Sequence, residues 1–173
     1  MQFNINDMIN ILDLKSKFVP VKKNGKQTII SFGLKPYYVD GNETELACWS
    51  MHTFTEKVPF NKIKSFILSR LNEQIDQKII NGFVWKEMPV WLSSENQFNY
   101  KTAYDLAVMS QGKSLPTVFK FGTTDNPVYY AFESLDDISD FYISAMAYIN
   151  TCLAEGWKMK DSIDWSVYEK ALE

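Results

Sequence analysis

Residues 81–94 decide the fold class: they read Asn-Gly-Phe-Val-Trp-Lys-Glu-Met-Pro-Val-Trp-Leu-Ser-Ser. The Asn81-Gly82 pair ends a preceding helical pattern, because glycine adopts the left-handed cap conformation without a Cβ penalty. Residues 83–85 and 90–92 are apolar and aromatic on either side of a short turn, which predicts a tight hairpin. The stretch therefore predicts a helix that leads directly into a hairpin.

The chain before this stretch has the period of an amphipathic helix. From Pro59 onward, apolar residues recur at helical spacing, and they are Ile63, Phe66, Ile67, Leu71 and Ile75. The remaining positions of that helix carry Lys62, Lys64, Arg70, Glu73 and Asp76. We therefore expect one apolar face toward the core and a charged face toward water.

The same alternation continues after the stretch. Ser94 is expected to cap a helix that runs to about Ser110, with Gln97 as its reciprocal partner. Residues 117–122 and 127–133 predict a second hairpin. Ser134 is then expected to cap a third helix that ends at Gly156, with an apolar stripe at Ile138, Phe141, Tyr142, Ala145, Ile149 and Cys152. A short helix over residues 164–172 closes the chain.

The N-terminal part has a different pattern. Two hairpins are predicted, over residues 18–33 around Asn24-Gly25 and over residues 35–54 around a turn at residues 40–42. Residues 7–14 are expected to form a short helix or an arm. Connections of a few residues can only join antiparallel strands. The fold class is therefore α+β: an N-terminal antiparallel β meander at 1–57, followed at 58–173 by a helix-hairpin-helix module that can pack with it as one domain.

Composition excludes several classes of protein. The chain has 173 residues, 46% of them apolar and 23% charged, with a formal net charge of −3. No apolar run is long enough for a membrane span, and the N-terminus lacks the pattern of a signal peptide, so we expect a soluble protein. Nucleic acid is an unlikely partner at this charge. A basic cluster around the first hairpin is either its solvated tip or an arm for an acidic partner, and it comprises Lys15, Lys17, Lys22, Lys23 and Lys26.

Residues that could carry chemistry are few. His52 is the single histidine, and it follows Cys48 by four residues in a predicted strand, about 13 Å away at the usual rise. That distance prevents a direct catalytic pair. Asp136, Asp137 and Asp140 lack the spacing of a calcium loop and suit the start of a helix. We therefore predict a protein that is not an enzyme, with no catalytic residue, metal ligand or cofactor.

Aromatic residues are abundant, at 15% of the chain, and some are expected to face another chain. The helix after Ser94 has one apolar stripe at Tyr100, Ala103, Tyr104, Ala107 and Val108, and a second stripe on another side at Phe98, Thr102, Leu106 and Met109. The candidate interface residues are Phe98, Leu106, Met109, Trp91 and Tyr129. A rival interpretation is a carbohydrate-stacking platform made by the rings of Phe83, Trp85 and Trp91.

Residues 81–85 and 90–100, with the later run from Asp140-Phe141-Tyr142 to Gly156-Trp157, resemble a domain of unknown function found in bacteriophage proteins, often near tail and tail-fibre genes. The resemblance covers about residues 79–160, and the Asn, Lys and Ile bias is similar to that of crAss-like gut phages. It implies a virion structural protein at the tail or head–tail junction, made in the host cytoplasm, that docks as a homo-oligomer or ring with other phage structural proteins. The alternative of the same class is a tail-fibre assembly factor.

Overall fold

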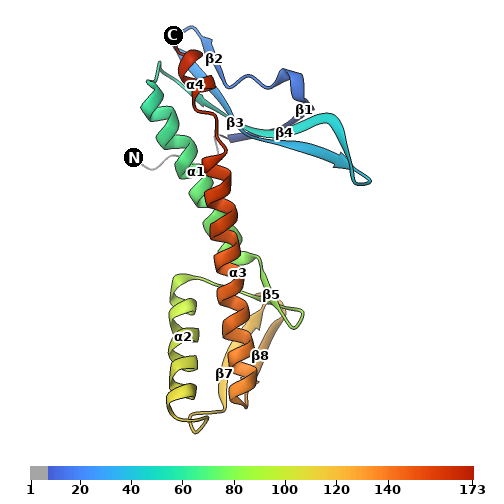
Figure 1. Cartoon of the computed structure of the whole chain (residues 1–173), viewed down its shortest axis with the longest axis vertical. Coiled ribbons are helices and arrows are strands. Elements are labelled where there is room, and N and C mark those ends of the chain that lie inside the picture. The colour runs from blue at the N-terminus through green and yellow to red at the C-terminus, as the bar shows by residue number, and fades with distance from the viewer. Residues whose placement is uncertain (1–7) are drawn as a thin grey trace. The chain divides into compact units, whose positions relative to one another are not determined.

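The computed structural model describes residues 8–173, which form two compact units (Figure 1). The first unit comprises the chain up to Ser69 together with Ile163–Glu173, and the second comprises Arg70–Ser162. The boundary between Ser69 and Arg70 falls inside helix α1 (Phe60–Asn81). The expected division at residues 57 and 58 stays a prediction. The α+β fold class is confirmed, with an N-terminal antiparallel meander followed by helices and hairpins.

The first unit is built on one antiparallel sheet. Its strands are β1 (Met8–Leu14), β2 (Val21–Asn24), β3 (Gln27–Val39) and β4 (Asn42–Phe54), in the order β1-β4-β3-β2, and a short 3-10 helix η2 (Lys15–Lys17) follows β1. The two expected hairpins are confirmed. The expectation of a helix over residues 7–14 is wrong for the described residues 8–14, because that segment pairs with β4 from Leu46 to His52.

One face of this sheet packs on the first half of α1. Thr28, Ile30 and Phe32 are buried on that face, as their alternation predicts. Phe66 of α1 lies with its ring centroid 6.0 Å from that of Phe32 in an edge-to-face contact. The last helix, α4 (Ser166–Lys170), belongs to the same unit, since the Tyr168 hydroxyl donates to the Ser31 carbonyl at 2.9 Å.

The second unit confirms the predicted alternation of helices and hairpins. The hairpins are β5 (Phe83–Trp85) with β6 (Met88–Val90) and β7 (Thr117–Gly122) with β8 (Pro127–Phe132), and the helices are α2 (Ser94–Met109) and α3 (Leu135–Asp161). No helix within residues 8–173 is long and apolar enough to cross a membrane.

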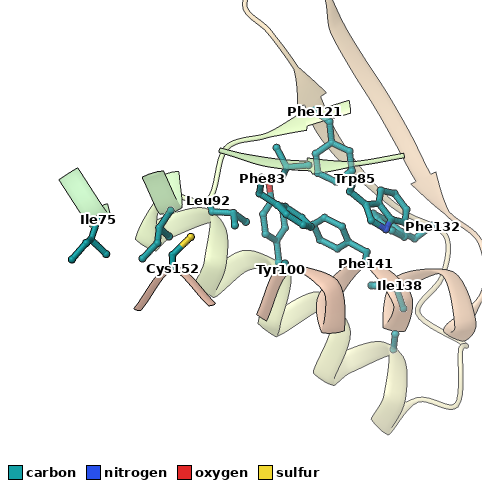
Figure 2. Close-up of a cluster of buried hydrophobic side chains, with 14 residues drawn as sticks. Ile75, Phe83, Trp85, Leu92, Tyr100, Phe121, Phe132, Ile138, Phe141 and Cys152 are labelled. Atoms are coloured by element: carbon teal, nitrogen blue, oxygen red, sulfur yellow. The ribbon is translucent and has the colours of Figure 1, made fainter. Parts of the chain in front are cut away.

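Aromatic rings form the centre of this second core (Figure 2). Trp85 stacks on Phe132 with ring centroids 5.4 Å apart and meets Phe141 edge-on at 5.1 Å. Tyr100 of α2 reaches the same cluster, 5.0 Å from Phe141. The first α2 stripe therefore packs inward, except for Val108, which is 46% exposed and corrects our expectation.

Gly156 does not end the third helix. Helix α3 continues to Asp161, and Gly156 is buried inside it. A Cβ added at Gly156 would lie 2.2 Å from Cδ1 of Ile75 on α1. The missing side chain therefore allows α1 and α3 to approach closely within the second unit, and the expected helix end at Gly156 is wrong.

Two further expectations need correction. The cap of α2 is Ser93 rather than Ser94: its hydroxyl accepts from the Asn96 backbone N–H at 3.2 Å. Arg70, expected on the charged face of α1, is only 3% exposed and forms an ion pair with Glu73 at 2.5 Å. A long side chain can bury its stem while the guanidinium keeps a charged partner. The Ser134 cap of α3 is confirmed.

Candidate functional site

The single histidine lies in an apolar environment in the first unit. His52 is 7% exposed, and its ring stacks on Phe66 with centroids 4.2 Å apart and meets Phe54 edge-on. Cys48 is half-buried on the same regular strand, and the register of β1 and β4 shows no bulge between the two residues. The structure therefore does not bring Cys48 and His52 together as a nucleophile and a base.

Metal-ligating side chains are not grouped in the part of the chain that the structure describes. Within residues 8–173, no three histidine, cysteine, aspartate or glutamate residues could hold a metal ion together. Two of the three clustered aspartates, Asp137 and Asp140, instead bind groups of the β5–β6 and β7–β8 hairpins.

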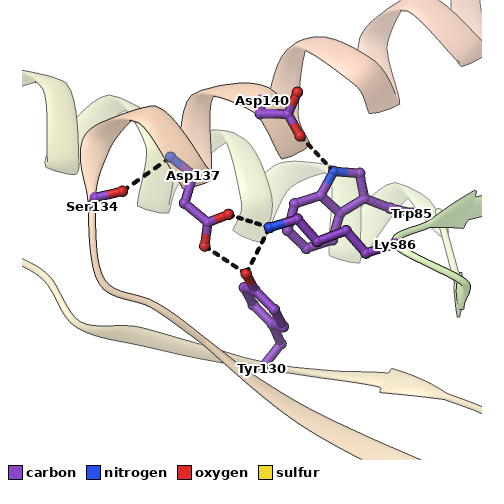
Figure 3. A network of polar contacts seen from close by, with 6 residues as sticks. All are labelled: Trp85, Lys86, Tyr130, Ser134, Asp137 and Asp140. Carbon is purple, nitrogen blue, oxygen red and sulfur yellow. Dashed lines mark hydrogen bonds and ion pairs between the residues drawn. The ribbon is translucent and has the colours of Figure 1, made fainter.

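Figure 3 shows this polar network at the start of α3. The Lys86 ammonium donates to Asp137 at 2.6 Å and to the Tyr130 hydroxyl at 2.8 Å, and Tyr130 in turn donates to Asp137. The indole N–H of Trp85 donates to Asp140 at 2.9 Å. The hydrogen bonds to Asp137 and Tyr130 raise the pKa of Lys86 above its usual range, so the ammonium stays charged.

The network holds a strained turn. Lys86 and Glu87 join β5 to β6, and both have positive φ angles, 46° and 64°. Such a turn favours Asn-Gly, since side chains with a Cβ are disfavoured in the left-handed region. The Lys86 ammonium also lies 4.3 Å from the centroid of the Trp85 ring. We conclude that this cluster fixes the β5–β6 hairpin on α3 and on the β7–β8 hairpin.

The aromatic hairpin does not offer a three-ring platform. Phe83 and Trp85 are 6% and 5% exposed and belong to the core. Trp91 lies just after β6 and is 62% exposed. Two of the three rings of the expected carbohydrate platform therefore cannot stack on a sugar, and their role is cross-strand and interlayer packing.

The second stripe of α2 lies on the surface. Phe98, Leu106 and Met109 are 69%, 54% and 82% exposed. The opposite side of α2 is taken by the core through Tyr100 and Ala107. We name Phe98, Leu106 and Met109 the α2 stripe.

Trp91 and Tyr129, the other two candidate interface residues, do not belong to the α2 stripe, and Trp91 lines a groove. The groove has a volume of about 660 Å³, and its lining includes Trp91, Asn96 and Lys120. Tyr129, which is 68% exposed, pairs across the β7–β8 hairpin with Lys120. The five predicted residues thus fall on two surfaces of the second unit.

The basic cluster near the first hairpin is solvated. All five of its lysines are exposed. Lys17 forms an ion pair with Asp13 at 2.9 Å, Lys15 lies 3.7 Å from Glu43, and Lys23 donates to the Leu172 carbonyl. Part of the positive charge is therefore balanced within the first unit, as a solvated hairpin region predicts.

The sequence pattern missed another exposed apolar surface. Ile143 and Trp157 of α3 are 60% and 59% exposed. They lie outside the inward stripe of α3, whose residues Ile138, Phe141, Ala145 and Cys152 are buried. The sequence does hold a signal for this surface: Ile143 and Trp157 are fourteen residues apart, which is close to four full helical turns and places them on the same side of the helix.

Comparison with known families gives one match. The family described as a domain of unknown function (DUF4376) matches residues 62–172, which is more than half of the chain and extends from near the start of α1 to the end of α4. Among curated proteins no match was found, and no solved structure matches either.

Proposed function

This chain belongs to the DUF4376 family, and we propose that it is a non-enzymatic structural protein of a bacteriophage virion, at the tail or the head–tail junction. Its action is the docking of subunits through the α2 stripe. The α2 stripe is the observation that carries docking. The phage setting rests on the resemblance of residues 79–160 to phage proteins.

The energetic argument starts from the exposure of the stripe. Phe98, Leu106 and Met109 keep more than half of their surface in water, while Tyr100 and Ala107 on the other side of α2 are buried. Fully burying one such side chain is worth roughly 1.5–3 kcal/mol. Clustered exposed apolar residues of this kind mark interaction sites in soluble proteins. Because a few anchors carry most of the energy of an interface, three residues suffice for specific docking.

The arrangement of copies follows from the position of the stripe. The α2 stripe and the groove beside Trp91 are different surfaces of one unit. A contact that joins different patches on neighbouring subunits is heterologous, and it generates a ring when the rotation closes. A homo-oligomeric ring is therefore the assembly that we propose.

The test replaces two anchors of the stripe. A Phe98→Ser and Leu106→Ser double variant should keep its circular dichroism spectrum and lose subunit association by sedimentation, together with incorporation into particles. The matched control is Asn99→Ser with Lys101→Ser, two exposed polar positions on the same helix. A folded stripe variant that assembles like the control would refute docking through α2. An unfolded variant would place the stripe in the core.

The alternative is a tail-fibre assembly factor that uses the same stripe but leaves the mature particle. Mass spectrometry of purified particles separates the two functions, because a structural protein is retained in the particle and an assembly factor is not. We do not retain carbohydrate binding by the aromatic hairpin, since Phe83 and Trp85 are buried.

A further inference from the structure

Two Asn-Gly pairs occur in the chain, and the structure places them in different surroundings. Asn24-Gly25 is at the tip of the β2–β3 hairpin, and Asn81-Gly82 is at the end of α1. All four residues are exposed to water. Asparagine is thermally labile, and a following glycine leaves its side-chain amide open to attack because glycine has no Cβ. The two pairs therefore differ in how their backbone is held rather than in access to water.

The backbone around Asn81 is held firmly. The Gly82 backbone N–H donates to the Lys78 carbonyl at 2.9 Å, which continues the hydrogen bonding of α1. The Asn81 side-chain amide donates to the side-chain oxygen of Gln77 at 3.0 Å. A Cβ added at Gly82 would lie 2.2 Å from the Tyr148 hydroxyl, so this side chain packs against the Gly82 backbone. Reorienting Asn81 therefore requires breaking helical hydrogen bonds and a close packing contact.

The backbone around Asn24 is held by fewer contacts. Asn24 is the last residue of β2, a four-residue strand at the edge of its sheet, and it pairs with Gln27. Gly25 begins the turn with a φ angle of 60°. Within residues 8–173, no backbone acceptor binds the Gly25 N–H, and no hydrogen bond holds the Asn24 side chain. Such a strand end opens locally at a low cost in free energy.

The charges near the two pairs also differ. Deamidation begins when the glycine backbone N–H loses its proton, and nearby positive charge stabilises the anion that forms. Close to Asn24 in sequence, three exposed lysines surround the turn: Lys22, Lys23 and Lys26. At the end of α1, Lys78 instead forms an ion pair with Glu155, so its charge is balanced. Charge therefore favours the reaction at the hairpin tip, by an amount that salt reduces.

The reaction needs only water and hydroxide. Hydroxide removes the proton of the Gly25 backbone N–H, and the nitrogen attacks Cγ of Asn24. The new C–N bond closes a five-membered succinimide ring, and the side-chain nitrogen takes a proton from water and leaves as ammonia. Water then adds to one carbonyl of the ring and breaks one C–N bond. Breaking the bond at Cγ gives aspartate, and breaking the bond at the backbone carbonyl carbon gives isoaspartate.

From this contrast we propose that Asn24 is a modification site at which the chain deamidates spontaneously, whereas Asn81 is protected by the fold. The modification goes beyond docking through the α2 stripe and uses none of its residues. Either product places a carboxylate beside Lys23 and Lys26, so the basic cluster loses part of its positive charge. Isoaspartate also adds one methylene group to the backbone of the β2–β3 turn.

The modified hairpin is tied to the C-terminal residues of the first unit. The Lys23 ammonium donates to the Leu172 carbonyl at 2.7 Å. Turn type and loop length fix the register of a hairpin, so an extra backbone atom in the turn disturbs the pairing of Asn24 with Gln27. Conversion to isoaspartate therefore weakens the pairing of β2 and its contact with Leu172.

Mass spectrometry of the aged chain tests the site. The full chain is incubated in mildly alkaline buffer, with and without urea, and is then digested with a protease that cleaves before aspartate. The fragment from Asp13 to Val39 contains Asn24 as its single asparagine. In the folded chain, residue 24 should convert at least about ten times faster than Asn81, and in urea the two rates should be similar. Similar rates in the folded chain, or the same tenfold ratio in urea, would overturn selection of the site by the fold.

Hydrogen exchange with an Asn24→Ser control supplies the second measurement. The serine keeps a polar side chain at the tip and has no amide to lose. After the same incubation without urea, the exchange protection of the β2 amides should fall at least about tenfold in converted molecules of the unchanged chain and stay constant in the variant. Equal protection before and after conversion would overturn the effect on β2. The Phe98→Ser and Leu106→Ser variant should still deamidate at Asn24, so the two proposals fail independently.

Discussion

Replacing Gly156 by alanine tests whether α1 and α3 approach as closely as the structure places them. Gly156 is inside α3, where alanine is favoured over glycine by about 1 kcal/mol of helix propensity. The added Cβ would lie 2.2 Å from Cδ1 and 2.8 Å from Cγ1 of Ile75. Ile75 is 7% exposed and packed in the core of the second unit, so its side chain has little room to move.

The two effects have opposite signs. Inserting a methyl group into a packed core costs about 1–3 kcal/mol. With the propensity gain subtracted, Gly156→Ala should lower the free energy of unfolding by about 1 kcal/mol. Ile75→Val removes the closest atom and, alone, should cost about 0.5–1.5 kcal/mol. In the double variant the contact with Cδ1 is removed while that with Cγ1 at 2.8 Å remains, so the clash is relieved in part, and we expect a coupling of about 0.5–1 kcal/mol in favour of stability.

Urea unfolding of the four proteins in this cycle, followed by circular dichroism, provides the measurement. A gain of about 1 kcal/mol for Gly156→Ala alone would mean that propensity acts without a clash, and the close approach of α1 and α3 would be wrong. Purely additive effects of the two substitutions would lead to the same conclusion.

Three further substitutions probe other parts of the chain. Phe66→Ala and Phe141→Ala should each cost about 3–5 kcal/mol in denaturant unfolding, and a loss below about 1 kcal/mol for both would contradict the assigned core. Glu87→Gly should raise the melting temperature, since glycine relieves the positive φ of 64° at the β5–β6 turn, and an unchanged or lower value would argue against that strain. His52→Ala and Cys48→Ala should leave assembly and infectivity intact, apart from a stability loss of about 0.5–3 kcal/mol, and a folded His52 variant that lost function would reopen the enzyme interpretation.

Local patterns predicted the elements whose partners lie close in sequence. The apolar stripe from Ile63 to Ile75 was sufficient to predict α1, and the Ser134 cap was sufficient to predict the start of α3, because helical period and capping are determined within a few residues. Residues 8–14 could not be assigned in this way. Their strand depends on pairing with Leu46 to His52, more than thirty residues away, and a short apolar run carries no information about a distant edge.

Gly156 and Arg70 show the limit of single-residue rules. Glycine is read as a helix stop when only its backbone freedom is considered, but here its small volume is what α3 requires. Arginine is read as solvated, yet Arg70 is buried with Glu73 beside it. Both depend on what another element brings to the position, which local sequence does not encode.

The candidate surfaces were predicted in part. The exposure of Phe98, Leu106 and Met109 agrees with the prediction that the second apolar stripe of α2 is not buried in the core of its own unit. Their docking role stays a prediction. The exposed residues Ile143 and Trp157 of α3 could not be predicted, because the inward stripe of the same helix already accounts for its apolar period.

The packing of α4 has a consequence for the order in which the chain folds during synthesis. The Tyr168 hydroxyl donates to the Ser31 carbonyl, so the first unit is completed by residues that are synthesised after the whole second unit. The second unit is one continuous segment and has all of its contacts available earlier. Since domains fold as units while the chain emerges, the inserted unit can fold first. Once it is folded, the flexible chain between the two pieces of the first unit is shorter, so the entropy cost of bringing them together is smaller. The sheet of the first unit would then reach its final packing late, because the residues around Ser31 gain their contact with Tyr168 only after α4 has been synthesised.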